Sequence, residues 1–229
     1  MGIDAGRAAG EEEIRAGVTV ARDFHRMVNA HCRAAESVKR AVRCGVDVIY
    51  HCEHADEEAL DMLESVKDRV FVGPAIGLLH AAVHEAPEGA IHSGVRRGYD
   101  LGLAAASRAY PEMKKRGIRV VIGGDYGFAR TPQGENARDV EHFVRHLGYS
   151  PSEALVCATR YGAELMGMGN EAGLVREGFL ADVLLVDGDP VGDVTLLQHT
   201  ARLVAILKGG DVYKLDRDAL ARRAVRAAE

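Results

Sequence analysis

The sequence predicts an α/β fold in which parallel β-strands alternate with helices. Helix-like and strand-like segments follow one another along most of the chain, and the apolar run at 118–124 is typical of a strand buried on both faces. His31, His51 and Asp125 each stand at the end of a strand-like run. Since the parallel strands of a barrel end on one face, these three side chains are expected to converge there.

The alternation can be followed in order along the chain. Asp56, ahead of Glu57 and Glu58, marks a helix start, because carboxylates there face the unpaired amides of the first turn. Gly45 and Gly117 stand where a helix ends before a strand. The expected helices are 11–25, 34–44, 56–66, 97–115, 136–147 and 151–167, and the expected strands are 27–31, 46–51, 69–73 and 118–124.

Two regions depart from this alternation. Residues 74–96 form a long connection between the third and fourth strands, and connections of that length are commonly functional. From about residue 172, two strand-like runs separated by turn residues predict a small β appendage, followed by a charged helix at 216–228. We therefore expect one domain at 1–170 and a C-terminal β segment with its terminal helix at 171–229.

Composition disfavours several classes of protein. The 229 residues are 47% hydrophobic, which allows a sizeable core, and a net charge of −5 gives no basic face for nucleic acid. No apolar run approaches the length of a membrane span, and the N-terminal stretch lacks the apolar core of a signal peptide, so we expect a cytoplasmic protein with no membrane partner. Four cysteines without CxxC pairing fit reduced, buried thiols.

Five motifs resemble, in order, the second half of a metal-dependent hydrolase of the amidohydrolase superfamily. The most similar group contains imidazolonepropionase-like, Xaa-Pro dipeptidase-like and phenylurea or carbamate hydrolase-like enzymes. Over residues 11–214 the resemblance implies a partial TIM-type (β/α) barrel, strands five to eight, with a small C-terminal β appendage. The motifs are NAHC at 29–32, GVDVIYHCEHADEEALDML at 45–63, GGDYG at 123–127, SPSEALVCATRYGAELMGM at 150–168 and GLVREGFLADVLLVDGDPVGDV at 173–194.

The resemblance implies a Zn²⁺ or other divalent metal site formed by His31, His51 and Asp125. Imidazoles and a carboxylate suit such an ion. In the family, this aspartate also takes a proton from the attacking water. Strand six offers a second histidine, His54. We assign the ligand to His51 because Asp56 follows it at the family's five-residue spacing, and His54 stays open as an alternative ligand or a substrate contact.

Each of these residues also has an interpretation without a site. The two histidines can simply close strands beside a polar loop, and Asp125 can cap the next element. His80 and His84, at i, i+4 spacing, are either a substrate-facing pair or a solvated pair on a helix surface. Tyr126, next to Asp125, either binds substrate or packs in the core.

Parts of the family's metal site are missing from this sequence. There is no HxH pair and no counterpart of the strand-four lysine or glutamate. We therefore expect either a hydrolase that cleaves a C–N bond (amide, urea or carbamate) of a small-molecule substrate and is only a fragment of the full enzyme, or a catalytically inactive half-barrel that acts as an assembly module. In both cases a homo-oligomer, or association with a separate N-terminal half, is expected because an open half-sheet exposes unpaired edges.

Overall fold

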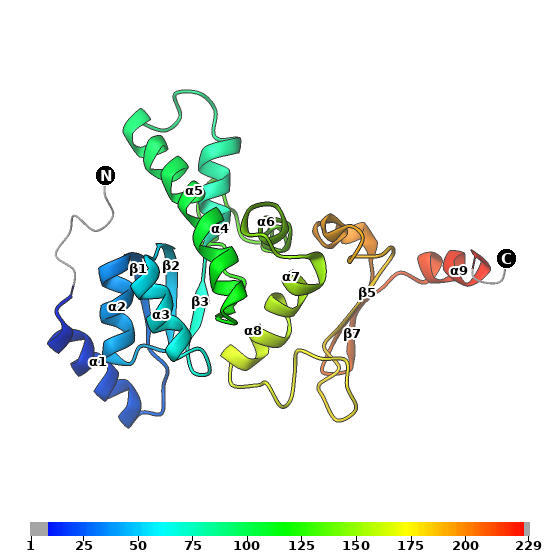
Figure 1. Cartoon of the computed structure of the whole chain (residues 1–229). Helices are drawn as coiled ribbons and strands as arrows, with labels where there is room; N and C mark the ends of the chain where they lie inside the picture. The colour runs from blue at the N-terminus through cyan, green and yellow to red at the C-terminus, as the bar shows by residue number, and fades with distance from the viewer. Residues whose placement is uncertain (1–8, 227–229) are drawn as a thin grey trace. The chain divides into compact units, whose positions relative to one another are not determined.

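The computed structural model describes residues 9–226, and its internal contacts divide the chain into two compact units, residues 1–149 and 150–229 (Figure 1). The predicted domain boundary at residue 170 lies within the second unit. It falls between the last helix before the strands, which ends at Leu165, and the first strand, which begins at Val183. The domain boundary at residue 170 stays a prediction.

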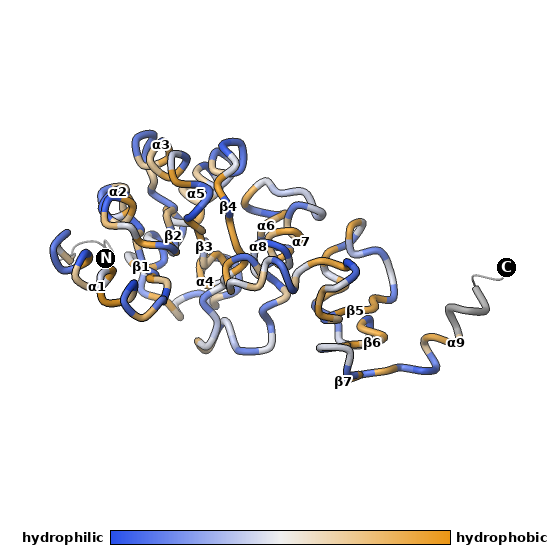
Figure 2. The backbone as a smooth tube through the Cα atoms, turned by 90° about the horizontal axis from the view of Figure 1, so that it is seen from below, coloured by the Kyte–Doolittle hydropathy of each residue, from blue (hydrophilic) through white to orange (hydrophobic). Residues whose placement is uncertain are grey.

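A four-stranded parallel sheet forms the centre of the first unit (Figure 1). Its spatial order, β1–β2–β3–β4, is the order of the sequence, as expected for successive crossover connections. The hydropathy along the chain shows the apolar run around β4 (Figure 2). This sheet confirms the predicted α/β fold with parallel strands. The strands are β1 (Asn29–Ala34), β2 (Val48–His54), β3 (Phe71–Gly73) and β4 (Arg119–Val120).

Helices lie between the strands and begin and end where the local sequence requires. Asp56 precedes α3, and its Oδ1 accepts a hydrogen bond from the Ala59 amide at 2.9 Å. Gly45 ends α2 with a left-handed φ of 85°, which glycine adopts without strain. α2 packs on β1 and β2, and α5 packs on β2. The longer helices of this unit are α1 (Glu11–Asp23), α2 (Ala35–Cys44), α3 (Glu57–Ser65), α5 (Ser93–Lys115) and α6 (Arg138–Leu147).

The two faces of the sheet have different surroundings. Ile49 and Val72 lie in register on one face, and both are fully buried. His31 and Tyr50 lie in register on the other face, where His31 is exposed and Tyr50 is half-buried. Gly73 continues that row, and a Cβ on it would lie only 2.7 Å from the Tyr50 ring. The face that carries the His31 side chain is therefore the more open one.

Two strands differ from the sequence prediction. β2 runs to His54, so the prediction that His54 lies in the following loop is wrong. β2 nevertheless pairs with β3 only as far as Tyr50. It pairs with β1 as far as His54, after a shift in register. β4 covers only two of the seven residues predicted for it, and the pair Gly123 and Gly124 that follows disfavours a regular strand.

Two helical regions also differ from the prediction. The connection at 74–96 contains a short helix, α4 (Ile76–His80), which continues into a π-helix, η1 (Ala81–Glu85). The single helix predicted at 151–167 is instead two helices, α7 (Pro151–Ala158) and α8 (Arg160–Leu165). The break falls at Thr159, whose ψ of −76° departs from helical geometry.

The second unit contains a three-stranded antiparallel sheet of order β5–β6–β7. The predicted strand-like runs supply β5 (Val183–Val186), and β6 (Leu203–Lys208) with β7 (Asp211–Leu215). Gly209 and Gly210, with φ of 58° and 91°, form the turn between β6 and β7. The remaining helical elements are η2 (Val194–Gln198), η3 (Thr200–Arg202) and α9 (Arg217–Arg226), and residues 227 and 228 of the terminal helix predicted at 216–228 lie outside the described residues.

Two further findings concern the whole described chain. All four cysteines lie among the described residues and are buried thiols that form no disulfide, as the sequence predicts. Across residues 9–226, none of the helices combines the length and the apolar character that crossing a membrane would require.

Candidate functional site

Two of the predicted metal ligands face each other across adjacent strands. His31 lies on β1 and His51 on β2, and His31 Nδ1 is 2.9 Å from His51 Nε2. His31 is exposed, whereas His51 is buried. The two rings are tilted by 47°, with their centroids 5.0 Å apart. The predicted convergence of the two histidines is therefore present in the structure.

The contact between these histidines depends on an irregularity in β2. The strand register pairs Cys32 with His51, so in a regular ladder the side chain of His51 would lie on the opposite face from that of His31. His51 and Cys52 instead have φ of 78° and 57°, in the left-handed region that is costly for residues other than glycine. This departure breaks the alternation of side chains at the position where the two imidazoles meet.

Buried polar groups hold the backbone around His51. The hydroxyl of Tyr110, a fully buried side chain of α5, donates a hydrogen bond to the carbonyl oxygen of His51. Two residues farther along β2, the buried carboxylate of Glu53 pairs with Arg33 of β1. Burial raises the pKa of Glu53, and the Arg33 guanidinium opposes that rise. These contacts anchor both strands next to the histidine pair.

The electrostatic environment keeps His51 neutral. Burial, followed by electrostatic interactions with Arg33 and with His31, lowers the pKa of His51 from 6.5 to about 3. A neutral imidazole is the form that binds a metal ion. The Nδ1 atom of His51 is buried without a hydrogen-bond partner, an arrangement that is uncommon away from functional sites. In donor chemistry and charge, the histidine pair fits a divalent metal ion.

Asp125 is the third predicted metal ligand. It follows β4 by five residues and has a left-handed φ of 59°. Among the described residues, its carboxylate does not form a compact group of three possible metal ligands with His31 and His51. The loop requires glycine at position 124, because a Cβ there would lie only 2.0 Å from the Tyr126 ring and 2.5 Å from the Asp139 carboxylate.

Tyr126 connects the Asp125 loop to a buried polar network. Its hydroxyl donates a hydrogen bond to Oδ1 of Asp139, at 3.1 Å, and the same oxygen lies 3.3 Å from Nδ1 of His142. Asp139 and His142 are both buried on α6. The His142 ring is 4.4 Å from the ring of His80, which is itself buried rather than facing an open pocket. Tyr126 and His80 are therefore parts of one network.

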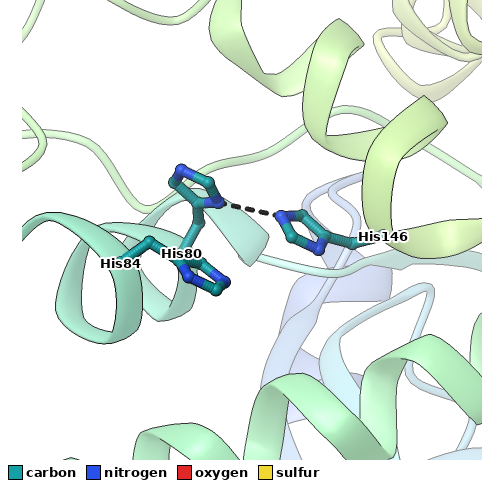
Figure 3. Close-up of side chains that lie close together, drawn as sticks. All are labelled: His80, His84 and His146. Carbon is teal, nitrogen blue, oxygen red and sulfur yellow. Dashed lines mark hydrogen bonds between the residues drawn. The ribbon is translucent and has the colours of Figure 1, made fainter.

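Three imidazoles of this region lie close together (Figure 3). His80 and His84 come from α4 and η1, and His146 comes from α6. One nitrogen of each can be chosen so that all three lie within 4.8 Å of one another, as expected of residues that could hold a metal ion. The sequence pattern predicted a pair at His80 and His84, whereas His142 and His146 were not predicted, although they have the same i, i+4 spacing.

The other predicted contact, His54, is exposed at the end of β2. Arg33, Glu53, Tyr110 and Asp139 had no distinguishing signal in the sequence. Their importance comes from burial next to the histidines, which single-sequence patterns do not report. The site roles of the predicted residues stay predictions.

The sequence profile of the amidohydrolase family matches residues 1–215. The chain belongs to the amidohydrolase family. This assignment confirms the resemblance on which the metal-site prediction was based.

Individual relatives agree with the assignment. Ochratoxinase of Aspergillus niger is 26% identical over 213 residues, which cover 89% of this chain and 41% of that enzyme. Imidazolonepropionase of Symbiobacterium thermophilum is 36% identical over 74 residues, or 32% of this chain and 17% of the enzyme. The crystal structure of a Xaa-Pro dipeptidase with bound methionine superposes with a TM-score of 0.76 at 25% identity, covering 90% of this chain and 49% of the dipeptidase. The chain thus spans half or less of the length of these relatives.

The environment of His51 predicts a pH-dependent stability. An unfolded histidine takes up a proton near pH 6.5, while the pKa of folded His51 is about 3, so unfolding binds a proton at intermediate pH. Stability is therefore lost as the pH falls from about 6.5 toward 3, with a slope of up to ~1.4 kcal/mol per pH unit from this residue. Urea unfolding of the metal-free chain at pH 6.5, 6.0, 5.5 and 5.0 measures this slope.

His51→Gln should make that slope shallower than in the unmodified chain. His54→Gln is the matched control, because the His54 side chain is exposed. Equal slopes in the two variants would show that His51 is not kept neutral by its surroundings.

Proposed function

We propose that this chain supplies part of the active site of a metal-dependent hydrolase that cleaves a C–N bond. The observation that carries the proposal is the pair of imidazole nitrogens, His31 Nδ1 and His51 Nε2, facing each other at 2.9 Å in a member of the amidohydrolase family. Two nitrogens bound to one tetrahedral zinc ion at about 2.0–2.1 Å lie roughly 3.3 Å apart. The observed separation supports a shared divalent metal.

The chemistry divides between the metal and the residues of the chain. A bound divalent ion acidifies water and polarises a carbonyl group. His31 and His51 would hold the ion, with His51 kept neutral by burial. Asp125 would accept the proton of the attacking water and deliver it to the leaving nitrogen. Its placement on a glycine-containing loop, at a left-handed φ of 59°, is typical of the strained backbone found at active sites.

The relatives favour an amide substrate. The structural neighbour described as a Xaa-Pro dipeptidase is, by its name, an enzyme that cleaves a peptide bond. We propose a peptide or other small amide for this chain, with urea and carbamate substrates as the alternatives. The connection at 74–96 would contact the substrate. It borders an open hollow of about 760 Å³, with Glu88, His92 and Arg96 in its lining.

A second candidate function is an assembly module without activity of its own. The observation that favours it is that, among the described residues, Asp125 does not form a compact group of three metal ligands with His31 and His51. No HxH pair is present in the sequence to complete such a site. Under this proposal the histidine pair is a remnant, and the open sheet serves for association.

Apolar exposure supports association under either proposal. α1 contains no buried residue, and on or just beyond it Val20, Phe24 and Met27 are 56%, 71% and 51% exposed. The strand after them, β1, ends the described sheet and pairs only with β2. Exposed apolar side chains and an unpaired strand edge both favour contact with another chain.

We expect the chain to form a dimer or larger assembly at micromolar concentration. Phe24→Glu should shift it toward the monomer, because a charge cannot be buried cheaply in an apolar contact. Val175→Glu, which changes a 94% exposed valine in the other unit, is the control. Sedimentation velocity measures both. A folded monomer of 24.6 kDa in the unmodified chain would contradict association.

The metal assignment predicts a site-resolved response to zinc. On titration at pH 7, the imidazole NMR signals of His31 and His51 should shift together with one Zn²⁺, because both nitrogens bind the same ion. His54→Ala should leave these shifts in place, and His31→Ala should remove the shift of His51. Shifts of His51 that depend on His54 rather than on His31 would move the site three residues along β2.

The activity is tested by reconstitution. The chain is mixed with a separately produced N-terminal barrel half that carries an HxH pair, and hydrolysis of a Xaa-Pro dipeptide is followed. Hydrolysis should appear only in the mixture, and Asp125→Asn should lower it by about 100-fold or more through loss of the proton acceptor. Asp100→Asn, at an exposed position on α5, is the control. A complex without hydrolysis would support the assembly module, and hydrolysis insensitive to Asp125→Asn would overturn the assigned role of that residue.

A further inference from the structure

Four histidines meet where the helical connection after β3 packs against α6. His80 and His84 lie one turn apart on α4 and η1, and His142 and His146 lie one turn apart on α6. Contacts between α4 and α6 bring the two pairs together, and Figure 3 shows three of the rings gathered at this junction. The strand-end pair, His31 and His51, belongs to different elements, so this cluster is a separate feature.

The geometry of three of these rings is that of a possible metal site. His80 Nδ1 and His146 Nε2 are 2.8 Å apart, and with a nitrogen of His84 they form a set within 4.8 Å. Nitrogens on one tetrahedral ion are roughly 3.3 Å apart, so a small rotation of the exposed His84 ring would close the set. The His84 and His146 rings are already nearly parallel, at 8°, with centroids 5.8 Å apart.

The charge state of the cluster also suits a cation. Burial, together with the nearby histidines, lowers the pKa values of His80 and His146 to about 4. Both imidazoles are therefore neutral at pH 7, and each offers a lone pair. Nδ1 of His80 and Nε2 of His146 are joined by a 2.8 Å hydrogen bond, in which one neutral ring donates and the other accepts, and a metal ion bound to both nitrogens would take the place of the shared proton.

The surroundings of His80 resemble the outer layer of a metal site. If Nδ1 of His80 faces the ion, its other nitrogen, Nε2, lies 3.3 Å from Oε1 of Glu85. Glu85 is in turn paired with Arg138 of α6. Metal-binding histidines usually donate their second N–H to a carboxylate that is itself hydrogen-bonded, because this fixes the ring and increases its basicity.

We propose that His80, His84 and His146 bind a divalent cation of the zinc class, in a site separate from the strand-end pair. Three imidazoles favour zinc, copper, nickel or cobalt over magnesium and calcium, which prefer oxygen ligands. Three protein ligands leave a fourth position for water or another small ligand.

The site would brace the loop that carries Asp125. The cation links α4 and η1 to α6, and α6 also presents Asp139, which accepts the hydrogen bond from Tyr126. Gly77 of α4 touches the same loop, since a Cβ on it would lie 3.0 Å from the Gly124 carbonyl oxygen. Binding at the junction therefore fixes both elements that contact the Asp125 and Tyr126 segment.

Cobalt binding tests the proposal without any need for activity. All proteins carry His31→Ala, which disables the strand-end pair, and Co²⁺ is titrated at pH 7 while visible absorption and calorimetry are recorded. One Co²⁺ should bind, with the absorption of nitrogen coordination. Adding His84→Ala should weaken binding at least about tenfold, the effect of losing 1.4 kcal/mol or more. His92→Ala, an exposed histidine on the same connection, should not change it.

His84 is the decisive position because its side chain is exposed, so its replacement removes a ligand without opening the core. His146→Ala is the second variant, and circular dichroism checks the fold of each protein. Zn²⁺ should also raise the melting temperature of the His92→Ala protein more than that of the His84→Ala protein, because a ligand of the folded state stabilises it in proportion to the logarithm of its affinity. Equal cobalt affinity in the His84→Ala and His92→Ala proteins, or no binding once His31 is replaced, would overturn the proposal.

Discussion

The parallel pairing of β1 with β2 is the constraint on which the candidate site depends. It brings the end of one strand beside the end of the next, and so sets His31 near His51 although twenty residues separate them. Regular pairing alone would leave the two imidazoles on opposite faces. The left-handed backbone at His51 and Cys52 removes that obstacle. Such strain costs about 1–3 kcal/mol per residue and persists only where the surroundings enforce it.

Those surroundings are buried and polar. The hydroxyl of Tyr110 donates a hydrogen bond to the carbonyl oxygen of His51. Two residues farther along β2, the ion pair of Glu53 with Arg33 connects β2 to β1. Breaking such a buried pair is costly, because one partner is left charged and unsatisfied. The strained backbone and the buried ion pair around the histidines both reduce stability. Such destabilising features are more typical of a functional site than of an ordinary hydrophobic core.

Burial of histidine recurs in two places with one physical consequence. The pKa values of His51, His80 and His146 all fall well below 6.5, chiefly because burial disfavours the charged imidazolium. Each ring is therefore a neutral nitrogen donor at physiological pH. At the strand ends this supports the proposed catalytic ion, and at the junction of α4 with α6 it supports a second, bracing ion. The junction contacts the loop that carries Asp125 and Tyr126 through Asp139 of α6.

Sequence alone determined the alternation of helices with parallel strands, because periodicity, helix starts such as Asp56 and helix ends such as Gly45 are local signals. It also determined the family, since motif order survives along the chain. Tertiary structure decided which side chains meet. The extension of β2 through His54, the short β4 ahead of Asp125 and the approach of His146 to His80 all depend on contacts between distant segments. Local patterns carry no information about such contacts, because burial and strand register arise only when the whole sheet and its helices pack together.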